Sequence, residues 1–437
     1  MFFTPYVPLA GSSDSADALG FNGLSAKLAD LLFPQFTVTT RRPAYHGFLC
    51  FALNYLKKNG YAGDSWSPEA RIRDLEIFWV AHSKHLKGEN ILNGDKFTDL
   101  GILSKKGLTL NRAQEDDLFY KDLVYGTYGH YAVPSQTWGL LETDRNLTEL
   151  GEELAEAWEA RGGGRNQFVP LLNKWMEGNQ PLPDSPNKKL RPYLASEDPS
   201  DREREVWREI IDETIQENPV SGLLWKKPIK KDTLKLADSE ENYCSFFDEV
   251  HNHYENYGPE PTRRELQQRL NLCQHFEAIG ALAQYVFERA YLRPDNWKPT
   301  PKDRVLQEKI WEALMGALKK FNSITCRDKP AWALPETLEG CSSSDLEAKI
   351  IEHHAAYQFQ KGAEPFMEGN TVKLEGQVKK KTGSRLTVEV LSEKLNALAE
   401  KGGADLVERI KRAAAWHYRR NWYFPKAQAW REYAGRV

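Results

Sequence analysis

Residues 262–291, TRRELQQRLNLCQHFEAIGALAQYVFERAY, carry apolar side chains at helical spacing over nearly thirty residues. The pattern ends shortly before Pro294, a residue that cannot continue a helix. A single amphipathic helix of this length is typical of helical proteins, because its apolar stripe needs other helices to cover it. We therefore predict a mainly α, multi-helical fold.

The same spacing predicts helices on both sides of this stretch. Start signals support several of them, such as Ser67 before Pro68 and Thr300 before Pro301. The predicted helices cover residues 23–33, 45–56, 68–86, 112–124, 148–161, 201–216, 245–257, 301–321, 345–360, 392–400 and 405–423.

The segment 111–161 predicts a compact local unit. A polar helix leads into YGTYGHYAVPSQTWGLLE (residues 125–142), which we interpret as short hairpin-like segments, and a helix then opens at Thr148. Helix, hairpin and helix in this order resemble the end of a winged helix. Such a unit would either contact DNA or dock on another protein, and the sequence leaves both open.

Two further features set the expected domain organisation. Residues 162–200 are rich in Pro, Asn and Gly and are interpreted as a linker between an N-terminal domain (1–161) and a C-terminal domain (201–437). Residues 371–390, TVKLEGQVKKKTGSRLTVEV, alternate in polarity around Gly383, and this predicts a small β-hairpin.

Composition excludes several classes of protein. Hydrophobic residues make up 41% of the 437 residues and charged residues 28%, which is the balance of a globular protein and not of a disordered or collagenous one. The formal charge is −3, so any nucleic-acid site must be a local patch. No apolar run approaches the roughly 18 residues that span a bilayer, so no membrane association is expected.

Catalytic signatures are missing from the sequence. It contains no Walker A loop, no G-x-G-x-x-G, no H-E-x-x-H and no G-x-S-x-G. The five cysteines are scattered without a C-x-x-C pair, which is typical of reduced thiols in a cytoplasmic protein. We expect no cofactor and no metal, and a cytoplasmic location without a secretory signal.

The strongest binding signal is the predicted last helix. At about 100° per residue, Arg412, Trp416 and Arg419 lie on the side opposite the apolar face of this helix. Residues 409–437 contain eight lysines or arginines and one acidic residue. Arginines around an outward tryptophan suit phosphate contact with base stacking. The alternative is that Trp416 packs on another domain, with the arginines paired to carboxylates there.

Basic residues elsewhere extend the predicted nucleic-acid surface. The complete set of candidate residues is Arg41, Arg42, Lys226, Lys227, Lys379, Lys380, Lys381, Arg409, Arg412, Trp416, Arg419, Arg420 and Trp422. If these segments converge on one surface, binding will weaken steeply with salt.

Two histidines are the best candidates for metal chemistry. His251 and His253 lie among carboxylates in DEVHNHYENYGPE, but two residues apart on a helix they point about 200° away from each other. A metal-dependent nuclease is therefore the third hypothesis only.

The N-terminal segment carries a family resemblance. Asp17-Ala18-Leu19-Gly20, Leu28-Ala29-Asp30-Leu31-Leu32-Phe33-Pro34, Thr39-Thr40-Arg41-Arg42 and Tyr45 follow one another in the first fifty residues. This order resembles the opening of an uncharacterised group of bacterial proteins encoded in phage-defence gene islands, often beside helicase or nuclease genes. In those proteins the tyrosine comes one residue earlier. The resemblance implies a subunit of an antiviral system and brings no catalytic residue.

Together these observations predict a non-catalytic DNA-associated subunit of a multi-protein bacterial anti-phage defence system. It would bind single- or double-stranded DNA and recruit a helicase or nuclease on another chain. The alternative is a protein-only scaffold, suggested by thirteen tryptophans, a residue type enriched at interfaces.

Overall fold

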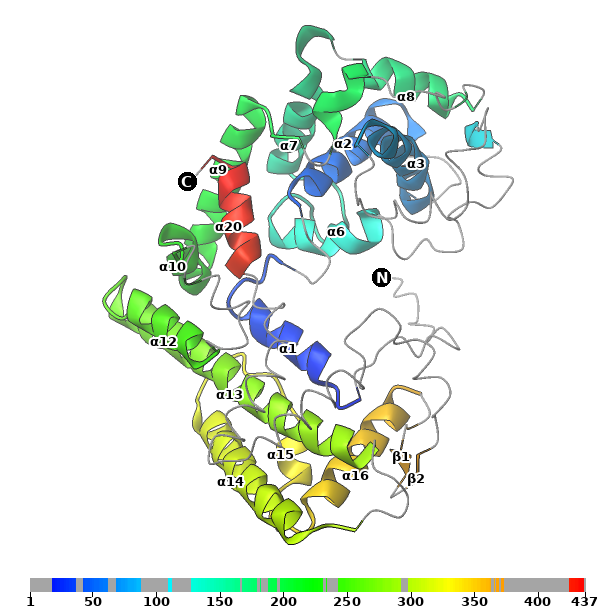
Figure 1. The fold of residues 1–437 in the computed structure, drawn as a ribbon. Helices are drawn as coiled ribbons and strands as arrows, with labels where there is room; N and C mark the ends of the chain where they lie inside the picture. The colour runs from blue at the N-terminus through cyan, green and yellow to red at the C-terminus, as the bar shows by residue number, and fades with distance from the viewer. Residues whose placement is uncertain are drawn as a thin grey trace. The chain divides into compact units, whose positions relative to one another are not determined.

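The computed structural model confirms that the chain is mainly helical (Figure 1). It describes residues 18–36, 42–61, 68–87, 109–111, 127–165, 167–178, 181, 188–194, 197–230, 233, 243–291, 298–362, 365, 367–368, 371–372 and 424–435. None of the helices in these ranges is both long enough and apolar enough to cross a bilayer.

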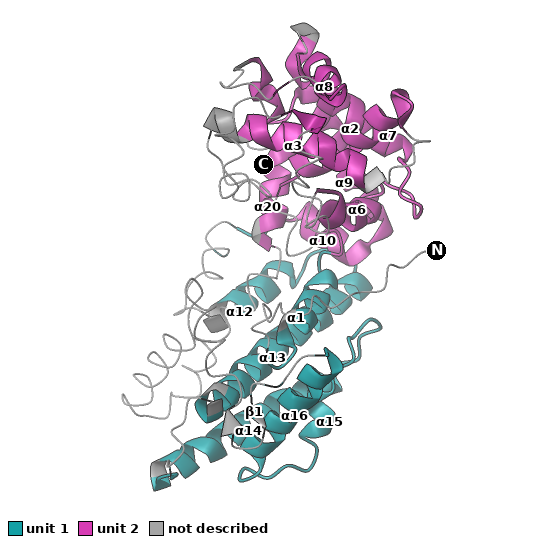
Figure 2. Ribbon diagram, turned by 90° about the vertical axis from the view of Figure 1, so that its right-hand side faces the viewer, with its two compact units in different colours: residues 1–33, 229–423 teal, residues 34–228, 424–437 magenta. Residues whose placement is uncertain are grey.

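The chain forms two compact units, coloured separately in Figure 2, and each unit is built from two separate stretches of sequence. Unit 1 comprises residues 1–33 and 229–423, and unit 2 comprises residues 34–228 and 424–437. The expected boundary at 162–200 therefore lies inside unit 2. The two units divide the chain at 33/34, 228/229 and 423/424 instead of at a single linker.

Unit 2 is a helical bundle. Its helices are α2 (Ala44–Lys58), α3 (Pro68–Lys87), α6 (Thr127–Thr137), α7 (Glu149–Glu159), α8 (Phe168–Met176), α9 (Asp201–Glu217), α10 (Pro219–Lys226) and α20 (Phe424–Tyr433), with 3₁₀ turns η4 (Ala160–Arg165) and η5 (Lys188–Tyr193).

Helix α2 is buried in unit 2, as its apolar sequence predicted. Twelve of its fifteen residues are buried. It packs against α7 where Gly47 faces Trp158: a Cβ at position 47 would lie 2.7 Å from the indole Cδ1. A side chain there would displace the tryptophan, so glycine sets the separation of these two helices.

The expected linker is part of this core. Phe168 and Trp175 of α8 are buried, and the indole Nε1 of Trp175 donates to the carbonyl of Asp74 at 2.9 Å. The indole Nε1 of Trp79 donates a hydrogen bond to the backbone carbonyl of Tyr193 in η5, at 2.7 Å. The helices of this stretch are short, and its buried aromatic residues pack it into the core of unit 2.

The hairpin-like interpretation of residues 125–142 is wrong over α6. Tyr128, Tyr131, Ala132 and Ser135 are all buried, which is the i, i+3, i+4, i+7 spacing of one helix face. Only one isolated β-bridge, Leu141 to Leu147, follows it within the described part of this segment. Helix α7 then begins as predicted, with Thr148 as N-cap accepting from Gly151 N at 3.1 Å. A winged-helix unit is therefore not supported.

Unit 1 is built around its long helix α13 (Glu260–Tyr291). Its elements are α1 (Phe21–Asp30), α12 (Tyr243–Tyr254), α13 (Glu260–Tyr291), α14 (Pro301–Ser323), α15 (Leu334–Thr337), α16 (Leu346–Gln360), β1 (Met367–Glu368) and β2 (Thr371–Val372).

Helix α13 confirms the predicted stretch and packs against α1, α14 and α16. Helix α14 begins with the expected Thr300 cap, in a reciprocal capping box with Asp303. Antiparallel β1 and β2 pair Met367 with Val372, so the described pairing lies mostly before the hairpin expected at 371–390. Residues 373–423, including the predicted helices 392–400 and 405–423, lie outside the described residues.

Residues 18–20, which precede α1, are held by hydrogen bonds within unit 1. His353 Nε2 lies 3.2 Å from the carbonyl oxygen of Leu19, and His354 Nδ1 lies 2.7 Å from that of Ala18. Gln358 also donates to the Ala18 carbonyl, at 3.2 Å. Helix α16 therefore holds the short segment that precedes α1.

Candidate functional site

Three of the thirteen residues expected to bind nucleic acid lie within the described part of the chain. Lys226 is the exposed last residue of α10, and Lys227 is its partly buried C-cap. Arg42 is partly buried two residues before α2. All three belong to unit 2. The other ten lie outside the described residues: Arg41, Lys379, Lys380, Lys381, Arg409, Arg412, Trp416, Arg419, Arg420 and Trp422.

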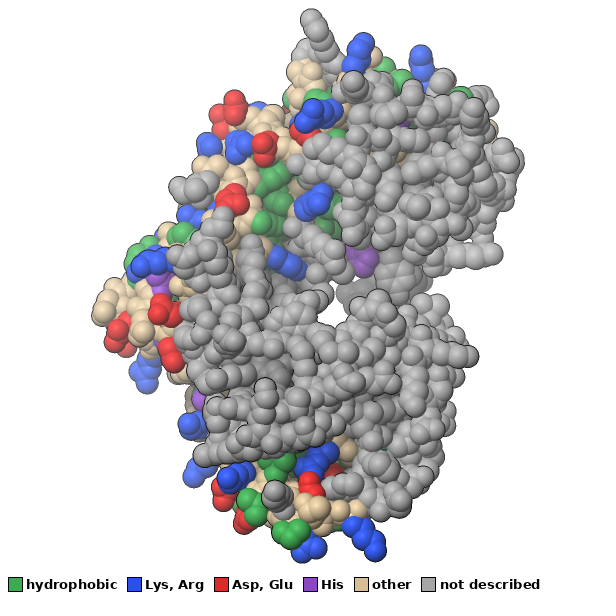
Figure 3. All heavy atoms as spheres, viewed as in Figure 1, with side chains coloured by type: hydrophobic (Ala, Val, Ile, Leu, Met, Phe, Trp, Pro, Cys, Tyr) green, Lys and Arg blue, Asp and Glu red, His purple; other side chains and the backbone are tan. Residues whose placement is uncertain are grey.

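The described surface does not show a concentrated basic patch on the face drawn in Figure 3. Lysine and arginine side chains there lie among aspartate and glutamate side chains. Examples of paired charges in unit 2 are Lys57 with Glu152 at 2.8 Å and Arg202 with Glu153 at 3.1 Å. Paired surface charges of this kind contribute little to stability and partly cancel each other's field.

A second candidate site, not anticipated from the sequence, is where α20 docks within unit 2. We define the α20 docking site as Phe36, His46, Trp138, Arg161, Glu203, Arg204, Trp207 and Arg208. All eight residues contact α20 or the two residues that follow it.

Trp430 is the aromatic centre of this site and is 1% exposed. Its ring stacks on Trp138, with centroids 4.7 Å apart and planes 9° apart. Phe36 and Trp207 meet it edge-on, at 5.2 and 5.0 Å between centroids. Offset-stacked and T-shaped pairs at these separations are the favourable aromatic geometries, so Trp430 is a packing anchor and not an exposed stacking platform.

Several polar atoms buried in this aromatic cluster have no hydrogen-bond partner among the residues that the structure describes. They are the indole Nε1 of Trp138, Trp207 and Trp430 and the Nε2 of His46. Edge-to-face indoles can direct N–H groups at neighbouring rings, but such contacts are weaker than N–H···O bonds. Burial lowers the pKa of His46 to about 3, so the imidazole is neutral. Its Nδ1 lies 2.7 Å from Ser135 Oγ.

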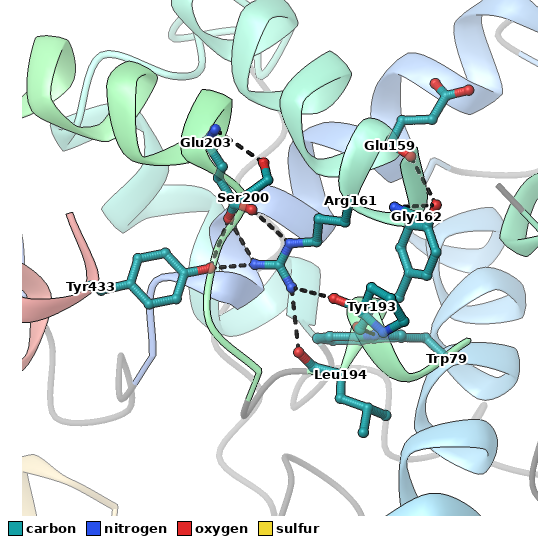
Figure 4. Close-up of polar contacts among 10 residues, drawn as sticks. Trp79, Glu159, Arg161, Gly162, Tyr193, Leu194, Ser200, Glu203 and Tyr433 are labelled. Carbon is teal, nitrogen blue, oxygen red and sulfur yellow. Dashed lines mark hydrogen bonds and ion pairs between the residues drawn. The ribbon is translucent and has the colours of Figure 1, made fainter. Parts of the chain in front are cut away.

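The polar part of the site is the cluster of Arg161, Glu203 and Tyr433 drawn in Figure 4. Arg161 binds Glu203 through two N–H groups, Nε to Oε2 at 2.6 Å and Nη2 to Oε1 at 2.8 Å. Its Nη1 donates to the carbonyls of Pro192 and Leu194, each at 3.3 Å. The side chains of Arg161 and Glu203 are 1% and 0% exposed.

Tyr433 of α20 completes this cluster. Its hydroxyl accepts from Arg161 Nη2 and donates to Glu203 Oε1 at 2.7 Å. Burial raises the pKa of Tyr433 well above its usual value, and Arg161 only partly offsets this. For Arg161, burial lowers the pKa, but Tyr433 and Glu203 outweigh burial and the net shift is upward. The upward shifts keep both groups protonated, so Arg161 stays positively charged beside the Glu203 carboxylate and the Tyr433 hydroxyl stays a hydrogen-bond donor.

Two arginines of α9 hold the end of α20. Arg204 Nη1 lies 3.5 Å from the carbonyl oxygen of Tyr433, and Arg208 Nε donates to that of Ala434 at 2.9 Å. The last carbonyls of a helix lack partners within the helix and carry partial negative charge. The guanidinium groups therefore stabilise the C-terminal end of α20.

The histidines considered for metal chemistry do not form a common site. His251 and His253 both lie on helix α12, where a spacing of two residues turns their side chains away from each other. Within the described ranges, no group of three or more His, Cys, Asp or Glu residues is arranged to hold a metal ion.

A signal for the α20 site is present in the sequence. Phe424, Ala427, Trp430 and Ala434 are buried at spacings of three and four residues, and Pro425 suits a first helical turn. This helical spacing is easily missed in the sequence, because Trp430 follows the basic and aromatic residues 409–423 and looks like part of the same segment. The partners of Trp430 could not be predicted, since they come from residues 36–208.

Comparison with known proteins adds no relative. No protein-family model, curated protein or solved structure matches the chain.

Proposed function

We propose that this chain is a non-catalytic, DNA-associated subunit of a multi-protein bacterial anti-phage defence system. It binds nucleic acid through residues 409–422 and recruits a helicase or nuclease carried on another chain. The defence role rests on the N-terminal resemblance, and the nucleic-acid role rests on the chemistry of the C-terminal segment.

The observation that carries the nucleic-acid role is the composition of residues 409–422. Five lysines or arginines occur there with no acidic residue, and Trp416 and Trp422 lie among them. Positive charge would neutralise phosphates, and indole rings would stack on bases. The segment is followed after one residue by α20, whose Phe424 is buried in unit 2. A segment attached to a docked helix loses less conformational freedom on binding than a free tail.

The distribution of tryptophans favours this proposal over a protein-only scaffold. Seven of the thirteen are buried in unit 2 and pack within it: Trp79, Trp138, Trp158, Trp175, Trp207, Trp225 and Trp430. The tryptophan surplus that suggested a scaffold is therefore largely accounted for by packing. The proposal makes no use of a winged-helix unit, because residues 127–137 form a helix.

The test is a triple variant, Arg412→Ala, Trp416→Ala and Arg419→Ala, in the full chain. Loss of one stacked base and two phosphate contacts should weaken binding to single-stranded DNA at least about tenfold. The matched control is Lys319→Ala with Lys320→Ala, which removes two exposed positive charges from α14. Equal affinities for the triple variant, the control and the wild type would reject the proposed segment.

Binding of a neighbouring gene product together with no DNA binding would instead support the scaffold. Size-exclusion chromatography with light scattering, on the chain alone and mixed with that product, distinguishes these outcomes.

A further inference from the structure

The α20 docking site is built entirely by one continuous stretch of the chain. Its eight residues lie between Phe36 and Arg208, whereas α20 follows only after the second stretch of unit 1, residues 229–423. Helix α20 is therefore joined to its site by packing and hydrogen bonds and not by a short connection. The residues of the site and the helix that occupies it are therefore far apart in the sequence, although they belong to one chain.

The occupant has the pattern of a helical peptide ligand. Phe424, Ala427, Trp430 and Ala434 line one buried face, while Ala429 and Glu432 are exposed. Amphipathic helices that bind in grooves use anchors at these spacings. The large central anchor is a tryptophan, the residue type most often found to dominate such interfaces.

The site keeps its internal polar contacts without α20. Arg161 is held by both carboxylate oxygens of Glu203 and by two backbone carbonyls of the segment 192–194, none of which belongs to α20. Tyr433 adds to a pair that is already formed. Removal of α20 therefore leaves no unpaired buried charge, which is the loss that would otherwise collapse the site.

Docking also carries a cost. The Nε1 atoms of Trp138, Trp207 and Trp430 are buried and have no acceptor within the described ranges. Trp430 lies on α20 itself, so on release its N–H group would gain a water partner, and docking removes that hydrogen bond without a replacement among the described residues. The apolar burial of Trp430 is offset by this loss, and the docked state is weaker than its buried area suggests.

From these four observations we propose that the α20 docking site is a helix-binding surface whose ligand is the chain's own residues 424–435, bound reversibly. Release exposes an aromatic surface centred on Trp138 and Trp207. The proposal is independent of nucleic-acid binding.

The test uses the full chain with Trp430→Ala, which weakens the attached ligand and leaves every residue of the site intact. A fluorescent synthetic peptide of residues 424–437 should bind this variant, and unlabelled peptide should displace it. The wild-type chain should bind at least about tenfold more weakly, because its own helix occupies the site at high effective concentration. A peptide carrying Trp430→Ala should lose at least about tenfold in affinity for the variant chain.

No peptide binding to a Trp430→Ala chain with wild-type helix content would overturn the proposal, and so would equal binding to variant and wild type. If the variant does not fold, Tyr433→Phe provides the second test by hydrogen–deuterium exchange. In this variant, amides of residues 424–434 should exchange through an opening of lower free energy than the opening that exposes the amides of α2 and α7. Exchange of all three helices as one cooperative unit would contradict reversible docking.

Discussion

At the scale of single residues, Arg161 and Glu203 connect four segments of unit 2: η4, η5, α9 and α20. Removing one partner of a buried ion pair leaves the other charge without compensation. The sequence does not single out either residue, because arginine and glutamate are common on helix surfaces and only the three-dimensional fold buries these two together.

We predict that Glu203→Gln destabilises unit 2 by about 3–5 kcal/mol, because Arg161 stays buried without a carboxylate. Tyr433→Phe, which removes a single hydroxyl, should cost about 1–3 kcal/mol. The control is Glu205→Gln on the same helix, where an exposed pair with Arg202 should contribute less than about 1 kcal/mol. Urea unfolding measures the free energy of unfolding of all three variants. If Glu203→Gln lowers it no more than Glu205→Gln, the buried Arg161–Glu203 pair does not stabilise unit 2 as predicted.

His46 gives unit 2 a predicted sensitivity to acid. Burial lowers its pKa from 6.5 to about 3, so below pH 6.5 the unfolded chain binds a proton that the folded chain does not. Stability is therefore fully present above pH 6.5 and falls as the pH decreases, by about 1.4 kcal/mol per pH unit for this one group.

The measurement is urea unfolding at pH 7, 6 and 5, followed by tryptophan fluorescence, which reports mainly on unit 2 because seven buried tryptophans lie there. A His46→Gln variant should show a shallower pH dependence than the wild type. Parallel pH profiles for the two proteins would show that His46 does not carry the effect.

At the scale of secondary-structure elements, the start of α1 provides a prediction with opposite signs at two glycines. Gly20 has φ +78°, and a Cβ there would lie 2.7 Å from the ring of Tyr357. Gly20→Ala should therefore destabilise unit 1 by more than about 1 kcal/mol. Gly23 lies inside the helix, and a Cβ added there would meet nothing within 4 Å, so Gly23→Ala should stabilise by up to about 1 kcal/mol.

Circular dichroism during thermal unfolding measures both changes, with the wild type run alongside. Equal destabilisation by the two substitutions would contradict this prediction, because only Gly20 combines a positive φ with a close approach to Tyr357 of α16.

Helices with a long apolar period were predictable from the sequence. The predictions for α2, α3, α9, α13 and α14 are confirmed, with ends that differ by a few residues. Helix α6 was not predicted, because its glycine, tyrosines and Pro134 are residues that also favour turns and strands. The helix is stabilised by burial against α2, where the ring of Tyr131 stacks on that of Tyr45 with the centroids 5.0 Å apart.

The domain organisation and the α20 site depend on contacts that no local pattern contains. Residues 162–200 have the composition of a linker, but Phe168, Trp175 and Tyr193 bind them to the core. The return of the C-terminal segment to unit 2 joins residues more than 200 apart, such as Trp207 and Trp430. A single sequence reports the apolar face of α20 and does not report which helices cover it.

At the scale of the whole molecule, the formal charge is −3, whereas residues 409–422 combine five positive charges and two tryptophans with no acidic residue. If these residues bind nucleic acid, the interaction is dominated by counterion release. If they pack against protein, added salt has a much smaller effect on any residual DNA binding.

The most direct test is a fluorescence-anisotropy titration of the full chain with labelled single-stranded DNA at about 50 mM and about 200 mM salt. Five phosphate contacts from residues 409–420 predict an affinity that falls about 100-fold between these conditions. The triple variant at positions 412, 416 and 419 should bind more weakly and depend less on salt. No binding at the lower salt concentration, or an affinity that does not change with salt, would contradict the proposed function.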